Sequence, residues 1–233
     1  MLSNKKILIV GGATGIGLAL ARRAQEEGGQ VILASRSSEK LQAAARSLPT
    51  PVQIETVDAT SDASVAALFE SIGSIDHMAV TIKPSLPSSP FKDNDINLAQ
   101  QAFDAKFWGQ YRLAKAALKT LSTNGSIVLT SGIAAQRSYM GYSAVSAMNA
   151  ATEALVKALA IEIAPHRINA VSPGFVEAEG DHVQRLAYAR NVGANFPLER
   201  LGYADEIAEA YLYLFKNAYA NGSCVVVDGG SVC

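Results

Sequence analysis

The chain has 233 residues, of which 49% are hydrophobic and 18% are charged, and its formal net charge is −1. This length fits one large α/β domain better than two small ones, and the composition is that of a soluble globular protein. The near-neutral balance, without a basic run, excludes a general nucleic-acid binder, because neutralising phosphates requires clustered Lys and Arg.

Membrane and secretory segments are also not expected. The apolar run at the N-terminus is too short for the core of a signal peptide, and no cleavage site follows it. The longest apolar candidate, after Tyr142, is interrupted by Asn149, Glu153, Lys157 and Glu162, so we predict that no segment spans a bilayer.

The two cysteines, Cys224 and Cys233, have the spacing of neither a disulfide framework nor a metal site. With three histidines and no Cys/His cluster, we predict no metal site. A reducing, cytoplasmic location is the default expectation.

Apolar runs alternate with helical periodicity along the whole chain, and the predicted elements follow in this order. A strand at 5–10 leads through a glycine loop to a helix at 18–29, followed by a strand at 30–35 and a helix at 38–48. A strand at 51–57, a helix at 63–73 and a strand at 75–80 come next, and a proline-rich loop covers 83–95. The last elements are a helix from Ile96 to Leu121, a strand at 125–131, a helix from Tyr142 to Ala164, and strands at 167–172 and 224–230.

Most of these strands are apolar along their whole length, which is typical of a parallel sheet covered on both faces. Right-handed crossovers then predict a Rossmann-type, doubly wound, seven-stranded sheet with helices on both faces, in a single domain of residues 1–233. Ligands bind such sheets at the carboxyl ends of the strands.

The glycine loop follows the first strand directly and opens a helix. Glycines at 11, 15 and 17 let the backbone turn tightly and approach a pyrophosphate, whose charge the helix N-terminus accepts. This context favours a dinucleotide site over a plain tight turn. The expected cofactor residues of the loop are Gly11, Ala13, Thr14, Gly15, Ile16 and Gly17.

The second strand ends at Ser35 and Arg36, where NAD-binding proteins usually place an acid for the ribose hydroxyls. Arg36 suits the 2′-phosphate of NADP(H), although a solvated arginine is the alternative. Asp58 ends the third strand, beside Ala59, and either accepts a hydrogen bond from the adenine amino group or caps the next helix.

Taken together, these residues resemble the short-chain dehydrogenase/reductase family in its single-domain form. "GGATGIG" is similar to the family's TGxxxGxG, with Val10 in place of the threonine, and "VDATSDASV" is similar to its adenine-binding segment. "RINAVSPG", "PLERLGYADEIAEAYLYL" and the closing "VVVDGG" are similar to later motifs, so the resemblance covers nearly the whole chain. It adds Thr81, Pro173, Gly174 and Val176 to the expected cofactor contacts.

The resemblance also implies a catalytic tetrad of Asn, Ser, Tyr and Lys, of which only the tyrosine, Tyr142, is matched cleanly. Ser146 stands at the lysine position of YxxxK and Lys106 at the asparagine position. For the serine, alignment without gaps places Gly132 at the catalytic position, whereas Ser131 fits if the short loop shifts. The family's NNAG is replaced by residues 80–83.

The resemblance implies an NADP(H)-dependent oxidoreductase of a small carbonyl or imine, in which Tyr142 supplies the proton and Ser131 and Lys106 complete the site. Lys106 is the first candidate for a replacement cation, followed by Arg137 and Lys83, and for each a solvated surface charge is the alternative. The loss of the lysine leaves two other functions open. These are a redox-inactive NADP-binding sensor or partner protein, and a cyclase or isomerase that uses the same pocket.

Residues around 175–200 correspond to the family's substrate lid. Its acids, Glu177, Glu179 and Asp181, suit either a cationic substrate or a solvated helix start. Its aromatics, Phe175, Tyr188 and Phe196, are candidates for the apolar walls of a pocket. The alanine-rich helix after Tyr142 presents apolar residues beyond one face, so we expect a homotetramer or homodimer that binds a small molecule and neither nucleic acid nor membrane.

Overall fold

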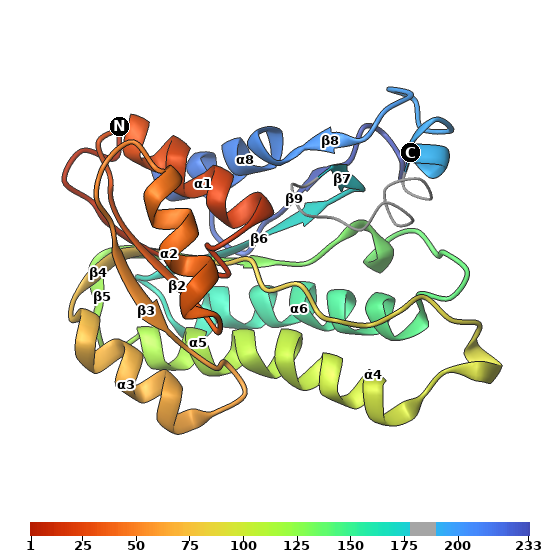
Figure 1. Cartoon of the computed structure of the whole chain (residues 1–233), viewed down its shortest axis with the longest axis horizontal. Coiled ribbons are helices and arrows are strands. Elements are labelled where there is room, and N and C mark those ends of the chain that lie inside the picture. Colours follow the sequence, from red (N-terminus) through yellow and green to blue (C-terminus); the bar gives the residue numbers. More distant parts are fainter. Residues whose placement is uncertain (178–189) are drawn as a thin grey trace.

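The computed structural model describes residues 1–177 and 190–233, and it confirms the predicted fold class. One parallel sheet has the strand order β3-β2-β1-β4-β5-β6-β9 (Figure 1). Its strands are β1 (Lys6–Val10), β2 (Gln30–Ser35), β3 (Gln53–Thr56), β4 (Ile75–Val80), β5 (Leu121–Thr130), β6 (Arg167–Pro173) and β9 (Cys224–Val227). The direction of winding reverses between β1 and β4, where a doubly wound sheet opens its ligand crevice.

Helices cover both faces of the sheet (Figure 1). One layer holds α1 (Gly15–Glu26), α2 (Ser38–Ser47) and α8 (Ala204–Lys216). The other holds α3 (Asp62–Ile72), α5 (Gly109–Ala117) and α6 (Ser143–Glu162), with α4 (Ile96–Phe103) leading into α5. Two short strands, β7 (Val176–Glu177) and β8 (Gly202–Tyr203), form a separate parallel pair.

The sheet divides the core into two halves because side chains alternate along each strand. In β1, Ile7 and Ile9 face the layer of α1 and α8, whereas Leu8 and Val10 face α3 and α5. All four are buried. Such strands read as continuous apolar runs in the sequence, which is why the fold class was predictable.

The helix predicted from Ile96 to Leu121 is wrong in two respects. It is interrupted by a π-helical segment at Asp104–Trp108, and it ends at Ala117. A π segment admits an extra residue into the turn, and this one carries the buried Lys106. Leu121 instead begins β5, where it pairs with Ile75.

The helix α8 was not among the predicted elements, although its signal is present in the sequence. Ile207, Tyr211 and Phe215 recur at helical spacing and are buried against α1 and the sheet. The carboxylate of Glu206 accepts the backbone N–H of Tyr203 and fixes the start of the helix.

By length and composition, α6 is long and apolar enough to cross a membrane. The sequence had led us to expect no such segment. Only 22% of its apolar window is buried in the described structure. Its polar residues Asn149 and Thr152, in contrast, are buried against the sheet and hydrogen-bonded. In this structure α6 is a covering helix whose outer side is apolar.

Candidate active site

The glycine loop lies at the carboxyl end of β1, as predicted. Gly11 and Gly15 have φ angles of +88° and +54°, which favour glycine. A Cβ at Gly17 would lie 2.5 Å from the carbonyl oxygen of Gly11 and 2.6 Å from Oγ1 of Thr81. Thr81 itself is tied to β1, since its N–H donates to the carbonyl of Val10 at 2.7 Å. The glycines therefore allow the loop to pack closely on itself and on Thr81.

The N-terminus of α1 receives no side-chain cap, although Thr14 occupies the N-cap position. The helices α2 and α3, which also follow strands, are capped by the hydroxyls of Ser37 and Ser61. The first N–H groups of α1 thus remain available for an anion, and its first turn holds no acid that would repel one. Ala13 is buried and Ile16 half-buried beside this opening.

Arg36 and Asp58 follow neighbouring strands, β2 and β3, and lie near each other. Hydrogen bonds from the backbone and hydroxyl of Thr60 lower the pKa of Asp58, and the charge of Arg36 adds to this effect. Ser61, not Asp58, caps α3, which removes the capping alternative for Asp58. Ser35 is half-buried at the end of β2 and Ala59 is buried.

The end of β6 carries the remaining residues that we expected to contact the cofactor. Pro173 is the last residue of β6, and the N–H of Gly174 donates to Val227 at 2.9 Å. A Cβ at Gly174 would lie 2.7 Å from Cα of Asp228, so only glycine fits between these strand ends. Val176 pairs with Gly202 in the small sheet.

Tyr142 immediately precedes α6, on the loop that follows the end of β5. Its ring packs against Tyr139 and Phe175 with centroids 6.1 and 6.4 Å away, and Phe175 contacts Phe196 at 5.9 Å. Phe175 and Phe196, predicted as pocket walls, thus join Tyr142 in one aromatic cluster. The contribution of Tyr139 was not predicted.

Lys106 is buried, so it is not a solvated surface charge. Its ammonium group donates to the carbonyl of Ser131 at 2.9 Å and to the side-chain oxygen of Asn149. Burial lowers the lysine pKa to about 8. Asn149 lies two helical turns beyond Tyr142 in α6, roughly 10 Å along the helix axis. The ammonium group is thus held at Asn149, whereas the expected reach of Lys106 toward Tyr142 stays a prediction.

Ser131 does not direct its hydroxyl toward Tyr142. The hydroxyl donates to the carboxylate of Glu153 at 2.8 Å and lies 3.2 Å from the carbonyl of Asn149, so it points along α6. A Cβ at Gly132 would lie 2.8 Å from the side-chain nitrogen of Asn149. The predicted role of Ser131 as the catalytic serine is thus not favoured by this geometry, and Gly132 has no room for one beside Asn149.

The spacing of these residues on α6 was a signal in the sequence. Tyr142, Ser146, Asn149 and Glu153 recur at helical intervals and share one side of the helix. The other candidate cations lie elsewhere. The guanidinium of Arg137 donates to the carbonyl of Ser231 and lies 5.8 Å over the Tyr139 ring, and Lys83 is exposed.

Part of the predicted lid falls outside the described residues. Glu179, Asp181 and Tyr188 belong to 178–189. Glu177 lies in β7 and forms an ion pair with Arg190.

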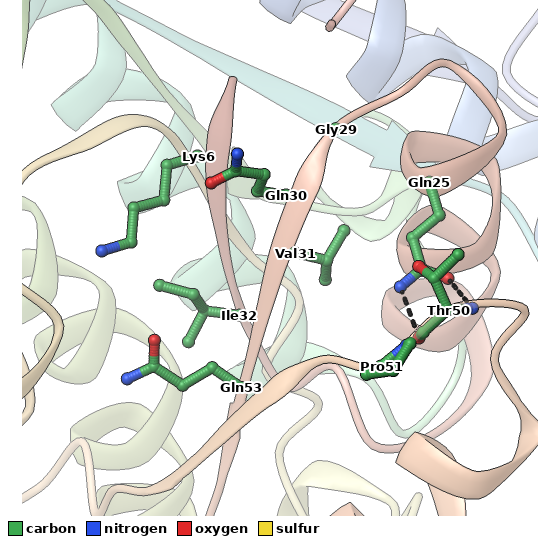
Figure 2. Close-up of a pocket in the computed structure, with 9 residues that line it drawn as sticks. All are labelled: Lys6, Gln25, Gly29, Gln30, Val31, Ile32, Thr50, Pro51 and Gln53. Atoms are coloured by element: carbon green, nitrogen blue, oxygen red, sulfur yellow. Dashed lines mark hydrogen bonds between the residues drawn. The ribbon is translucent and has the colours of Figure 1, made fainter. Parts of the chain in front are cut away.

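One cavity lies away from this site. It has a volume of about 270 Å³ and opens at the amino end of the sheet, beside Gln30, Val31 and Gln53 (Figure 2). It forms because β3 pairs with β2 only from Gln53 onward, while Thr50 is hydrogen-bonded to Gln25 of α1. Ligands of parallel sheets bind at the opposite end, where a smaller cavity of about 100 Å³ is lined by Phe175, Val227 and Asp228, among others.

The described residues contain no cluster of side chains that could bind a metal ion. No group of three or more His, Cys, Asp or Glu residues that could hold an ion is found in residues 1–177 and 190–233. Both cysteines are free thiols, and burial raises the pKa of Cys224 to about 12, which keeps it protonated. The absence of a metal stays a prediction.

Comparison with known proteins gives consistent matches over nearly the whole chain. A family model described as enoyl-(acyl carrier protein) reductase matches residues 11–231. A short-chain dehydrogenase/reductase of Acremonium sp, ucsE, is 31% identical over 99% of this chain and 96% of its own length.

Solved structures agree with this. A small-chain dehydrogenase in complex with NADPH has a TM-score of 0.85 and 32% identity, with 99% of each chain covered. The MalC reductase/Diels-Alderase from Malbranchea aurantiaca has a TM-score of 0.91 and 27% identity, with 99% of this chain and 96% of that chain covered.

Proposed function

The chain belongs to the short-chain dehydrogenase/reductase family, and from this premise we propose that it reduces a small carbonyl or imine substrate with NADP(H). The observation that carries the proposal is one shared edge of the sheet. There the uncapped N-terminus of α1, the strand ends at Arg36 and Gly174, and the phenol of Tyr142 all follow carboxyl ends of strands.

The residues at this edge fit a dinucleotide. The glycines at 11 and 17 let the loop pack closely against Thr81, and the first N–H groups of α1 would hold a pyrophosphate. Arg36 would pair with a 2′-phosphate, and no acid stands at the end of β2 to bind ribose hydroxyls. The structural relative that was solved with NADPH supports the same cofactor. When bound, NADPH would supply the hydride.

Tyr142 would supply the proton. Its phenol would give its proton to the carbonyl oxygen of the substrate when bound NADPH supplies the hydride to the carbonyl carbon, so that the carbonyl is reduced to an alcohol. The tyrosinate then recovers a proton from water. Because a phenol has a reference pKa of about 10, it donates a proton readily but is a poor base at neutral pH. The site is thus suited to reduction more than to oxidation.

Lys106 would assist from a distance. Its buried ammonium group, held at Asn149 of α6, would favour the tyrosinate that forms when the phenol gives up its proton, because opposite charges attract more strongly away from water. Ser146, at the position of the family lysine, brings a hydroxyl but no charge.

The test is the decay of NADPH absorbance in the presence of a panel of carbonyl and imine compounds. We expect turnover with some of them, and we expect Tyr142→Phe to abolish it while NADPH still binds. Ser146→Lys should improve the reverse oxidation, because it restores a cation one turn from the phenol. If Tyr142→Phe leaves the rate unchanged, the proton comes from another group.

A second candidate function is favoured by two observations. Ser146 stands at the position of the family lysine, and the chain resembles a protein named as a reductase/Diels-Alderase. A cyclase or isomerase would convert its substrate without net consumption of NADPH. A product assay that detects conversion while the NADPH absorbance stays constant would favour this function over reduction. Binding of NADPH with no conversion at all would favour the sensor or partner protein.

A further inference from the structure

Neither of the two positions expected for the family's catalytic serine offers a hydroxyl toward Tyr142. The hydroxyl of Ser131 is bound to Glu153, and Gly132 has no side chain. Asn149 fills the space beside Gly132 and would meet a Cβ there. A carbonyl oxygen placed at Tyr142 would therefore find no serine donor at either position.

Another tyrosine ring, that of Tyr139, lies beside Tyr142 because of a four-residue turn, Tyr139–Tyr142. The N–H of Tyr142 donates to the carbonyl of Tyr139 at 3.1 Å, and Gly141 supplies the φ of +81° that the third turn position needs. The turn brings both tyrosine rings together, with centroids 6.1 Å apart, and both contact Phe175.

The Tyr139 hydroxyl is buried and has no hydrogen-bond partner in the described structure. The residue as a whole is only half-buried, so its phenol points inward and not into solvent. Such a group is rare in native proteins, because a buried hydroxyl without a partner is destabilising. A hydrogen-bond acceptor on a substrate bound beside Tyr142 would give the Tyr139 hydroxyl a partner.

The ring of Tyr139 is held from two sides. The Arg137 guanidinium lies over it and is anchored on the carbonyl of Ser231 near the C-terminus, while Phe175 meets it edge-on at 5.4 Å. A donor held in place before the substrate arrives stabilises developing charge without a reorganisation cost at the moment of reaction.

We propose that Tyr139 is a second catalytic phenol, which donates a hydrogen bond to the carbonyl oxygen of the substrate and takes over the task of the missing serine. The inference rests on the proposed reduction at Tyr142. Tyr139 keeps its proton throughout, whereas Tyr142 transfers its own. The substrate class is a ketone or aldehyde whose oxygen accepts from both phenols and whose apolar part lies against Phe175.

The experiment compares Tyr139→Phe with Tyr142→Phe and with the exposed control Tyr219→Phe. We expect Tyr139→Phe to lower kcat/KM for the best carbonyl about 100-fold, mostly through kcat, as loss of one oxyanion donor does. NADPH affinity should not change, and the melting temperature should be equal or higher, because the variant removes a buried hydroxyl without a partner. Tyr219→Phe should match the wild type in every measurement.

Three results would overturn the inference. A Tyr139→Phe enzyme with wild-type kcat/KM, beside an inactive Tyr142→Phe enzyme, refutes the role of Tyr139 and leaves the proposed reduction intact. A loss of activity that follows a lowered melting temperature shows a structural role instead. A wild-type protein that reduces no carbonyl in the panel refutes both proposals together.

Discussion

Lys106 shows at the scale of one residue how burial turns an ordinary side chain into a candidate for chemistry. From the sequence it was one of three possible cations, and surface solvation was the alternative. It lies in the π-helical segment, where its ammonium group donates to two uncharged oxygen acceptors and desolvation brings its pKa to about 8. A lysine in this state changes charge close to physiological pH.

This gives the first prediction. If the Lys106 cation assists Tyr142, the rate of reduction should fall as pH rises through about 8, because the amine loses its charge there. Lys106→Met should be roughly 10-fold slower at pH 7, the lower range for one acid/base contributor, and should lose this descending limb. Lys115→Met, at an exposed position of α5, is the control. Identical pH profiles for both variants would contradict the role of Lys106.

His77 affects stability and not the site. It is buried in β4, bonded to the hydroxyl of Ser126 at 2.8 Å and stacked on Phe215. Burial lowers its pKa from 6.5 to about 4. The unfolded chain therefore binds a proton between pH 6.5 and 4 that the folded protein does not, so stability falls as pH falls through this window.

The second prediction is the size of that loss. A shift from 6.5 to about 4 corresponds to about 3 kcal/mol of unfolding free energy, present near pH 7 and lost toward pH 4. Urea unfolding at a series of pH values, at one fixed protein concentration, measures it. His77→Asn should show a much flatter dependence across the same window, and parallel curves would mean that other groups cause the acid sensitivity.

At the scale of elements, we expect the ends of β2 and β3 to decide between NADP(H) and NAD(H). Arg36 is exposed and close enough to Asp58 to lower its pKa, so the two residues border one region of the crevice. A 2′-phosphate there would meet the guanidinium, whereas NAD(H) has no group for it.

The third prediction follows from this placement. Arg36→Ala should weaken NADP(H) binding by about 1–3 kcal/mol, the worth of a hydrogen bond to a charged group, and should leave NAD(H) binding almost unchanged. Fluorescence titration with both cofactors measures it, and Arg46→Ala, on the exposed side of α2, serves as the control. Equal affinity of the wild type for both cofactors would show that Arg36 is a solvated arginine.

At the scale of the whole molecule, the outer side of α6 is the feature that the single chain does not explain. Its exposed positions carry a stripe of small and apolar residues at helical spacing: Ala147, Ala150, Ala154, Ala158 and Ile161. Small side chains allow close approach of a second helix, and symmetric assembly of identical chains is the common way to cover such a face.

The fourth prediction is therefore a homotetramer or homodimer. Light scattering should return a multiple of the 24.5 kDa chain mass at micromolar concentration. Ala154→Glu, in the middle of the stripe, should shift the mass toward one chain, whereas Ala43→Glu on the exposed side of α2 should not. A wild-type protein that scatters as a single chain would end this expectation.

The sequence alone was enough for the parallel sheet, the glycine loop and the position of Tyr142. Their signals are local: apolar runs of strand length, glycines directly after a strand, and a tyrosine at the start of a long helix. The helix α8 has an equally local signal, because Ile207, Tyr211 and Phe215 recur at helical spacing.

Only the tertiary structure decided the states of Lys106, Ser131 and Tyr139. Whether Lys106 is buried depends on the π-helical segment and on how α6 packs against β5, and the same packing directs the Ser131 hydroxyl to Glu153. The unpartnered hydroxyl of Tyr139 depends on contacts with Phe175 and Arg137. Periodicity and spacing describe neighbours along the chain, whereas burial and hydrogen bonding here are set by residues that are distant in sequence and meet only in the folded protein.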